Sequence, residues 1–162
     1  MEKMQSTVET IRNQLGNLIY GSDEDTIPGV LMKLLREKKK TIAMIDCGLG
    51  GAAWWGLHDA IHLDEDLAEA VAPLMGSKVC KPVSLPLLEL ATNVRTEFNS
   101  DIGVAIGAIQ PDGKGKQFEL AIRSDDFEVA ESFTYAGHSD FRHVRAVKQV
   151  LNTVRLALLG EI

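Results

Sequence analysis

Residues 46–51 have the composition of a reactive or ligand-binding turn, because they read Asp-Cys-Gly-Leu-Gly-Gly directly after a short apolar run. Gly48, Gly50 and Gly51 permit positive φ angles and close approach of backbone or ligand. A helix after this turn would present N–H groups and a positive dipole end, which suit a phosphate or carboxylate and stabilise the thiolate of Cys47. The same residues also fit a tight strand-to-helix turn with a small buried thiol, so both interpretations stay open here.

The glycine spacing also fits nucleotide-binding motifs. Gly48, Gly50 and Ala53 match the dinucleotide-binding fingerprint with alanine in its last position, and "IDCGLGG" resembles the glycine-rich first motif of S-adenosylmethionine methyltransferases. Both motifs require a second strand about 20 residues further on that ends in an acid for the ribose. The segment "LDEDLAEAVAPL" has a helical pattern instead. A strand at 65–72 would support this alternative, and a helix there would remove it.

Two histidines and two tryptophans follow the turn. His58 and His62 are spaced i and i+4, as in the zinc-binding helix of some metalloproteases, but Asp59 stands where the general-base glutamate is expected and no third ligand is evident. We therefore predict no metal site and no cofactor, and interpret the histidines as a solvated or helix-end pair. Trp54 and Trp55 are expected to pack in the fold rather than to form a stacking platform.

Hydrophobic periodicity predicts the elements that must position these residues. Helices are expected at 5–19, from Thr26 to the basic residues 36–40, at 51–61, near Pro73 as a short broken helix, from a Ser84 cap with Pro86 in the first turn, and over 141–158. The apolar stripe of the last helix is Phe141, Val144, Val147, Leu151, Val154 and Leu158. Strands are expected at 41–46 and 101–109, then a turn at 111–116 and an antiparallel pair at 117–124 and 127–135.

This order of elements predicts a three-layer α/β/α domain whose mixed sheet is covered on both faces. In such sheets ligands bind beyond the carboxyl ends of the strands. Three segments are therefore candidates for the mouth of a site, provided that they converge: 46–51, 107–111 and 137–142. Within them, the predicted ligand-binding residues are Asp46, Gly48, Gly50, Gly51, Gly107, Gln110, His138 and Arg142.

Composition restricts the classes of function. The 162 residues carry a net charge of −6 and 45% of them are hydrophobic, which suits one domain with a sizeable core and argues against a nucleic-acid surface. No apolar stretch approaches the roughly 18 residues of a membrane span. Cys47 and Cys80 lie far apart in different contexts, so we predict neither a disulfide nor a metal site from them. We expect a reducing, cytoplasmic setting.

Three segments in a fixed order carry a family resemblance. They are "LGNLIYGSDEDTIPGVLMKLLREKKKTIAMIDCGLGGAAWWGLHD", "NSDIGVAIGAIQPDGKG" and "FTYAGHSDFRHVRAVKQVLNTVRLAL". They resemble the opening, a middle motif and the ending of the C-terminal domain of CinA, the competence/damage-inducible protein family. By this resemblance, residues 23–162 form the CinA C-terminal-like domain, and residues 1–22 resemble the connector that precedes it. The resemblance therefore implies a CinA N-terminal domain as a fused or separate partner.

For function, the resemblance implies a nicotinamide-nucleotide amidohydrolase, a hydrolase of NAD salvage. Such proteins convert nicotinamide mononucleotide to nicotinic acid mononucleotide and ammonia without a metal. A serine in an "ESCTGG" turn is the nucleophile, and a tyrosine and a lysine from the following segment assist it. Backbone N–H groups can hold the developing oxyanion or the 5′-phosphate. The family also self-associates, so we expect at least a homodimer.

The sequence departs from the family where the chemistry would occur. Aligned without gaps, Cys47 takes the place of the nucleophilic serine, and Leu49 and Ile106 each replace a threonine. The segment that carries the tyrosine and lysine is shorter here and has no tyrosine, and Lys78 is its only lysine. Several polar groups around one turn are therefore lost together.

Two hypotheses follow from these departures. In the one we favour, the domain keeps the scaffold without the deamidase activity and serves as a nucleotide- or phosphate-binding or structural module. Leu49 and Ile106 would then pack near one another in a closed pocket. In the other, the chain is an active amidohydrolase on nicotinamide mononucleotide, with Cys47 as catalytic nucleophile and His138 or Lys78 as base, because a thiol needs less activation than a hydroxyl.

Overall fold

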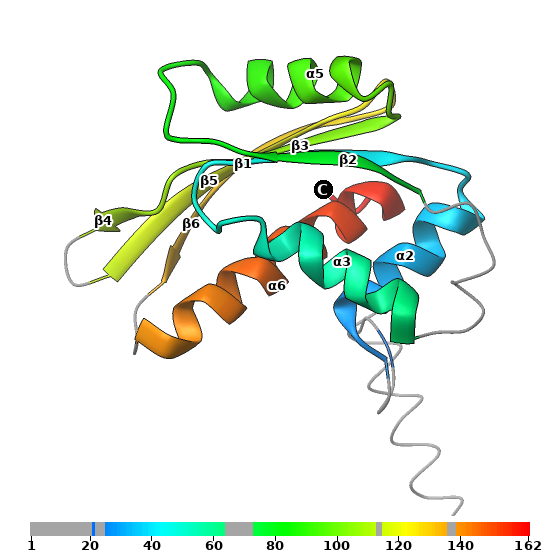
Figure 1. Cartoon of the computed structure of the whole chain (residues 1–162), viewed down its shortest axis with the longest axis horizontal. Coiled ribbons are helices and arrows are strands. Elements are labelled where there is room, and N and C mark those ends of the chain that lie inside the picture. Colours follow the sequence, from blue (N-terminus) through cyan, green and yellow to red (C-terminus); the bar gives the residue numbers. More distant parts are fainter. Residues whose placement is uncertain (1–20, 22–24, 64–72, 113–114, 136–138) are drawn as a thin grey trace, which may run out of the picture.

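The computed structural model describes Gly21 and residues 25–63, 73–112, 115–135 and 139–162. In this part, six strands form one mixed sheet with helices on both faces (Figure 1), which confirms the predicted α/β/α class. The helices are α2 (Ile27–Glu37), α3 (Ala52–Leu63), α5 (Leu87–Glu97) and α6 (Ser139–Leu159). The strands are β1 (Ile42–Asp46), β2 (Leu74–Val79), β3 (Ile102–Ile106), β4 (Gln110–Asp112), β5 (Gly115–Arg123) and β6 (Glu128–Tyr135). The predicted helix 5–19 and the connector 1–22 fall almost wholly outside the described residues.

The sheet combines a parallel half with an antiparallel half. Its strand order is β2-β1-β3-β5-β4, and β6 pairs with β5 as well. Strand β1 is parallel to both β2 and β3, whereas β5 is antiparallel to β3, β4 and β6. The carboxyl ends of β1, β2 and β3 therefore lie together at one edge, which is where a ligand crevice is expected in an open α/β sheet.

The two faces of the sheet are covered unequally. Of the described helices, α5 lies over one face, and α2, α3 and α6 cover the other (Figure 1). The larger core cluster joins the three-helix layer to the sheet and includes Leu31, Leu57, Phe118 and Leu151. A smaller cluster under α5 contains Leu90, Ala91, Ala105 and Ala121. No helix of the described residues is both long and apolar enough to cross a membrane.

Helix α2 begins where the sequence predicts. The Thr26 hydroxyl accepts a hydrogen bond from the Gly29 amide at 3.2 Å, and Pro28 lies in the first turn, where its missing N–H costs nothing. Leu31 and Leu35 are fully buried on the face toward the sheet. Burial of each such leucine contributes about 1.5–3 kcal/mol, so this face fixes the helix against the core.

Strand β2 corrects the expectation of a helix broken near Pro73. Residues 74–79 read Leu-Met-Gly-Ser-Lys-Val, and they pair with β1 in parallel. β2 is an edge strand of the described sheet, and Met75 and Val79 are exposed large apolar residues. An edge strand needs no continuous apolar run, so its sequence carries little strand signal. The rest of the predicted helix, residues 64–72, lies outside the described part.

Three side-chain expectations are also corrected. Pro86, not Ser84, is the N-cap of α5, and no side chain caps that helix. Trp54 packs against the main core as predicted, whereas Trp55 is 60% exposed. Val144 is 53% exposed, because the buried face of α6 is rotated away from it and runs through Ala146, Val150, Leu151, Val154 and Ala157.

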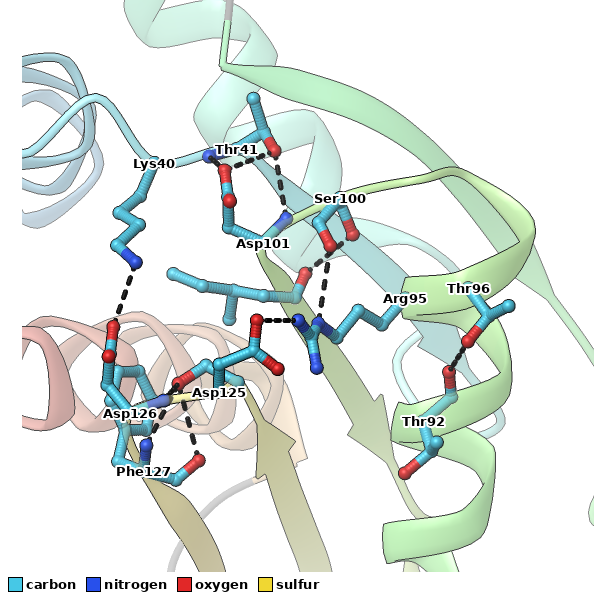
Figure 2. Close-up of polar contacts among 12 residues, drawn as sticks. Lys40, Thr41, Thr92, Arg95, Thr96, Ser100, Asp101, Asp125, Asp126 and Phe127 are labelled. Carbon is cyan, nitrogen blue, oxygen red and sulfur yellow. Dashed lines mark hydrogen bonds and ion pairs between the residues drawn. The ribbon is translucent and has the colours of Figure 1, made fainter.

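A polar network braces the amino ends of β1 and β3 (Figure 2). The Asp101 carboxylate accepts hydrogen bonds from the Thr41 amide at 2.7 Å and the Thr41 hydroxyl at 2.8 Å. The Thr41 hydroxyl in turn accepts one from the Asp101 amide at 2.9 Å. Arg95 of α5 pairs with Asp125 at 2.6 Å, and Lys40 pairs with Asp126 at 2.8 Å. These contacts join the entries of two strands to the β5–β6 connection.

The contacts of this network shift the pKa values of Asp101, Asp125 and Lys40. Burial alone would raise the pKa of Asp101, but the Thr41 amide and hydroxyl, helped by the charges of Lys40 and Arg95, outweigh it and lower that pKa below its ordinary value. The hydrogen bond from Arg95 lowers the pKa of Asp125. The hydrogen bond to Asp126 raises the pKa of Lys40. The charged forms are thus the ones that this end of the sheet stabilises.

Candidate functional site

The turn after β1 is organised around the carboxylate of Asp46. This side chain is 3% exposed and accepts three backbone hydrogen bonds. Its Oδ1 accepts from the amides of Gly48 at 2.8 Å and Leu49 at 2.6 Å, and its Oδ2 accepts from the Gly51 amide at 2.7 Å. The amides that were expected to face a ligand are therefore already paired within the chain.

The glycines of the turn are required by its geometry. Gly50 and Gly51 have φ angles of +62° and +84°, which side-chain-bearing residues rarely adopt. A Cβ at Gly48 would lie 2.3 Å from the carbonyl oxygen of Gly107. The Cys47 amide also donates to the Ile106 carbonyl at 2.9 Å. The predicted convergence of the 46–51 and 107–111 segments is confirmed.

The two cysteines correct a prediction. Cys47 and Cys80 form a disulfide, with their Cα atoms 4.8 Å apart. Each follows the last residue of its strand, and Asp46 of β1 is opposite Val79 of β2 in the register. No local pattern in the sequence indicates this pairing, because it depends on β2 lying beside β1. In this form Cys47 has no thiolate with which to attack a substrate.

A cavity of about 210 Å³ lies beside the disulfide, between α5 and the sheet. Three of the predicted site residues, Cys47, Gly107 and Gln110, line it together. Its further lining comes from the 82–86 segment, the first turns of α5, and residues 117–119 of β5. Sequence analysis missed Gln117 and Glu119, because no local signal indicates that β5 passes this crevice. The volume is below the roughly 300 Å³ at which ordinary ligand pockets begin.

A second, apolar groove of about 360 Å³ lies on the other side of the sheet, between the starts of α2 and α3 and the helix α6. His143 borders it, and its Nε2 lies 3.0 Å from the Leu49 carbonyl oxygen. His143 thus connects α6 to the glycine turn. The available sequence signal was its i, i+3, i+7 spacing with the buried residues Ala146 and Val150.

The remaining site candidates are distributed as follows. Gly50 is exposed at the tip of the turn. Lys78, a candidate base, forms an ion pair with Glu97 of α5. His138 lies outside the described residues, and so does the side chain of Arg142, a residue of α6. These two predictions stay untested.

The threonine replacements are buried and apolar, as expected of a closed pocket. Leu49 is 1% exposed and Ile106 is fully buried, and both belong to the main core cluster. Where the family has two hydroxyls, this chain places hydrocarbon against the core.

Two other sequence motifs can be compared with the structure. The His58 and His62 rings lie 4.9 Å apart on α3, and no group of three or more potential metal ligands occurs among the described residues. The dinucleotide alternative required a strand at 65–72, which falls outside that part of the chain. Strand β2 ends at Val79 and is followed by Cys80 and Lys81, so it supplies no acid for a ribose.

Comparison with known proteins yields relatives in both sequence and structure, although no family model matches the chain. A CinA-like protein of Prochlorococcus marinus (strain MIT 9312) is 24% identical over 94% of this chain, which spans 42% of that relative's length. A competence or damage-inducible protein from Enterobacter asburiae has a TM-score of 0.61 at 17% identity, covering 83% of this chain and 99% of that one. A CinA superfamily protein from Klebsiella pneumoniae has a TM-score of 0.64 at 13% identity, covering 83% and 96%.

The structural neighbours establish the fold, and the sequence relative covers nearly the whole of this chain. The mixed sheet with helices on both faces agrees with these neighbours. Taken together, these observations support the resemblance to CinA-like proteins that the sequence motifs indicated.

Proposed function

We propose that this chain is a divergent CinA-like domain that lacks the serine-type deamidation of nicotinamide mononucleotide and acts as a binding or structural module. The observation that carries the proposal is the occupation of the turn by Asp46. An oxyanion hole requires free donors aimed at the developing charge. Here the amides of Gly48, Leu49 and Gly51 already donate to a buried carboxylate.

The same contacts argue against a phosphate at the glycine turn. An incoming anion would have to displace the Asp46 carboxylate from three hydrogen bonds and then lie beside that negative charge. Like charges at such distances are strongly unfavourable in a buried site. A small, largely uncharged ligand in the cavity lined by Gly107, Gln110 and Gln117 fits this chain better than a nucleotide at Gly48–Gly51.

The test is release of ammonia and nicotinic acid mononucleotide from nicotinamide mononucleotide by the purified chain. The assay is run on the disulfide form, on the reduced protein and on the Cys47→Ala variant. We expect all three to give the same background. Turnover by the reduced protein that Cys47→Ala abolishes would overturn the proposal.

A second candidate function is amidohydrolysis with Cys47 as nucleophile. It is favoured by one observation, the position of Cys47 in the wall of a cavity beside Gln110 and Glu119. Such an enzyme would be inactive as the disulfide and active after reduction. Ammonia release by the reduced protein in the same assay therefore distinguishes the two functions, because only the amidohydrolase would show it.

We also propose that the chain forms a homodimer. Its support is the resemblance to self-associating CinA proteins and the exposure of Trp55 and Val79, both of which border the position of a Gly51 Cβ. Light scattering on the purified protein should give at least twice the monomer mass. A monomer across the accessible concentration range would contradict this.

A further inference from the structure

Cys47 and Cys80 are the two cysteines of the chain, and they pair with each other within it. Their backbone positions do not depend on the disulfide alone. The Cys80 amide donates to the Asp46 carbonyl at 2.8 Å, and the Cys47 amide donates to the Ile106 carbonyl at 2.9 Å. The strands would therefore keep the backbone of the two cysteines close together after reduction.

The two sulfur atoms have different surroundings. Cys47 packs against the small cluster under α5 and lines the 210 Å³ cavity. Cys80 leads into residues 81–86, all of which are exposed. Both cysteines are only partly buried, and Cys80 adjoins the exposed segment.

We propose that Cys47–Cys80 is a redox-active couple that exchanges with small thiols at Cys80 and releases the Cys47 thiol into the cavity. One thiolate of a dithiol attacks Cys80 Sγ, the protein S–S bond breaks, and Cys47 leaves as a thiolate that takes up a proton. The second thiol of the dithiol, or a second molecule of a monothiol such as glutathione, then attacks as its thiolate the reductant sulfur of the mixed disulfide, and Cys80 leaves as a thiolate that takes up a proton. The protein gains two electrons and two protons, and the reductant leaves as its own disulfide.

The first test is a redox titration of the full native chain with dithiothreitol and with glutathione buffers, read by alkylation and mass spectrometry. We expect both cysteines to become alkylated together, within minutes to hours, and the disulfide to return when oxidised glutathione replaces the reductant and takes up the two electrons. A disulfide that becomes reducible only after denaturation would overturn the proposal. The readout involves neither ammonia nor nucleotide, so it fails or succeeds independently of the proposed function.

The second test separates the two sulfur atoms. Cys47→Ser leaves Cys80 as the single thiol, and Cys80→Ser leaves Cys47, with circular dichroism as the control for folding. A bulky polyethylene-glycol maleimide should label Cys80 at least about tenfold faster than Cys47, because the nucleophilic sulfur must be accessible. Small iodoacetamide should label both. Equal rates with the bulky reagent, or faster labelling of Cys47, would contradict attack at Cys80 and a Cys47 thiol confined to the cavity.

Discussion

The two ends of the parallel strands are stabilised in different ways. At the amino ends, Asp101 and Thr41 pair side chain to backbone in both directions (Figure 2). The carboxylates of the neighbouring ion pairs, Asp125 and Asp126, are exposed. At the carboxyl ends, one buried carboxylate, Asp46, holds a whole turn, and a disulfide and a cavity lie beside it. The amino ends are therefore held by several hydrogen bonds and ion pairs that back one another up. The carboxyl ends depend on a few buried groups, and a cavity remains beside them.

The disulfide should have the largest effect on stability. It closes a loop with a sequence separation of 33 residues, so its loss should lower the free energy of unfolding by about 3–4 kcal/mol in the chain-entropy model. For a protein of this size that corresponds to a fall in Tm of about 10 °C. Thermal unfolding of the oxidised and reduced protein measures it. The Cys47→Ser/Cys80→Ser double variant, which should not respond to reductant, is the control.

Asp46→Ala should come next. It leaves the amides of Gly48, Leu49 and Gly51 without their acceptor, and we expect a loss of about 3 kcal/mol once water satisfies part of the deficit. Urea unfolding measures this. The matched control is Asp126→Ala, which removes an exposed carboxylate and should cost no more than about 0.5 kcal/mol. If both variants lost the same free energy of unfolding, the carboxyl ends of the strands would depend on a buried carboxylate no more than the amino ends do.

Thr41→Val tests the brace at the amino end. The substitution keeps the shape but removes both hydrogen bonds of the hydroxyl with Asp101. We expect a loss of about 1–2 kcal/mol in urea unfolding. Thr92→Val, at an exposed position of α5, is the control and should stay within about 0.5 kcal/mol of wild type. If Thr41→Val lost more free energy of unfolding than Asp46→Ala, the amino ends of the strands, and not the carboxyl ends, would depend more on single polar groups.

The smallest expected effect is the pH dependence contributed by Asp101. Because its pKa is lowered in the fold, its charged form adds stability above the unfolded carboxyl pKa of about 3.9, and that stability is lost as the pH falls through the folded value. Asp101→Asn should therefore lie below wild type at neutral pH and converge with it in acid. Urea unfolding between neutral pH and pH 3 checks this. A constant difference at every pH would show that the carboxylate charge is not involved.

Much of the fold could be predicted from sequence because its strongest signals are local. The apolar runs of β1 and β3, the alternation of β5 and β6, and the Thr26–Pro28 start of α2 each identify their own element. β2 could not be identified in this way, since an exposed edge strand carries Gly76, Ser77 and Lys78 in place of an apolar run.

For the candidate site, the residue types and the geometry of the turn could be predicted from the sequence. The partners that these residues contact in the fold could not. The glycines of the turn could be predicted because positive φ and close backbone approach favour glycine whatever surrounds them. Asp46 was expected to face a ligand, and instead it accepts the amides of its own turn. Gln117 and Glu119 reach the cavity only because β5 lies antiparallel to β3.

The sequence by itself determined an α/β domain with a glycine turn after its first strand, because hydrophobic period and backbone sterics act over a few residues. Only the tertiary structure decided what that turn does. The placement of β2 beside β1 brings Cys80 to Cys47, and the folding of the turn over Asp46 pairs its amides. Both outcomes depend on contacts between segments whose separation along the chain hides them from any local pattern.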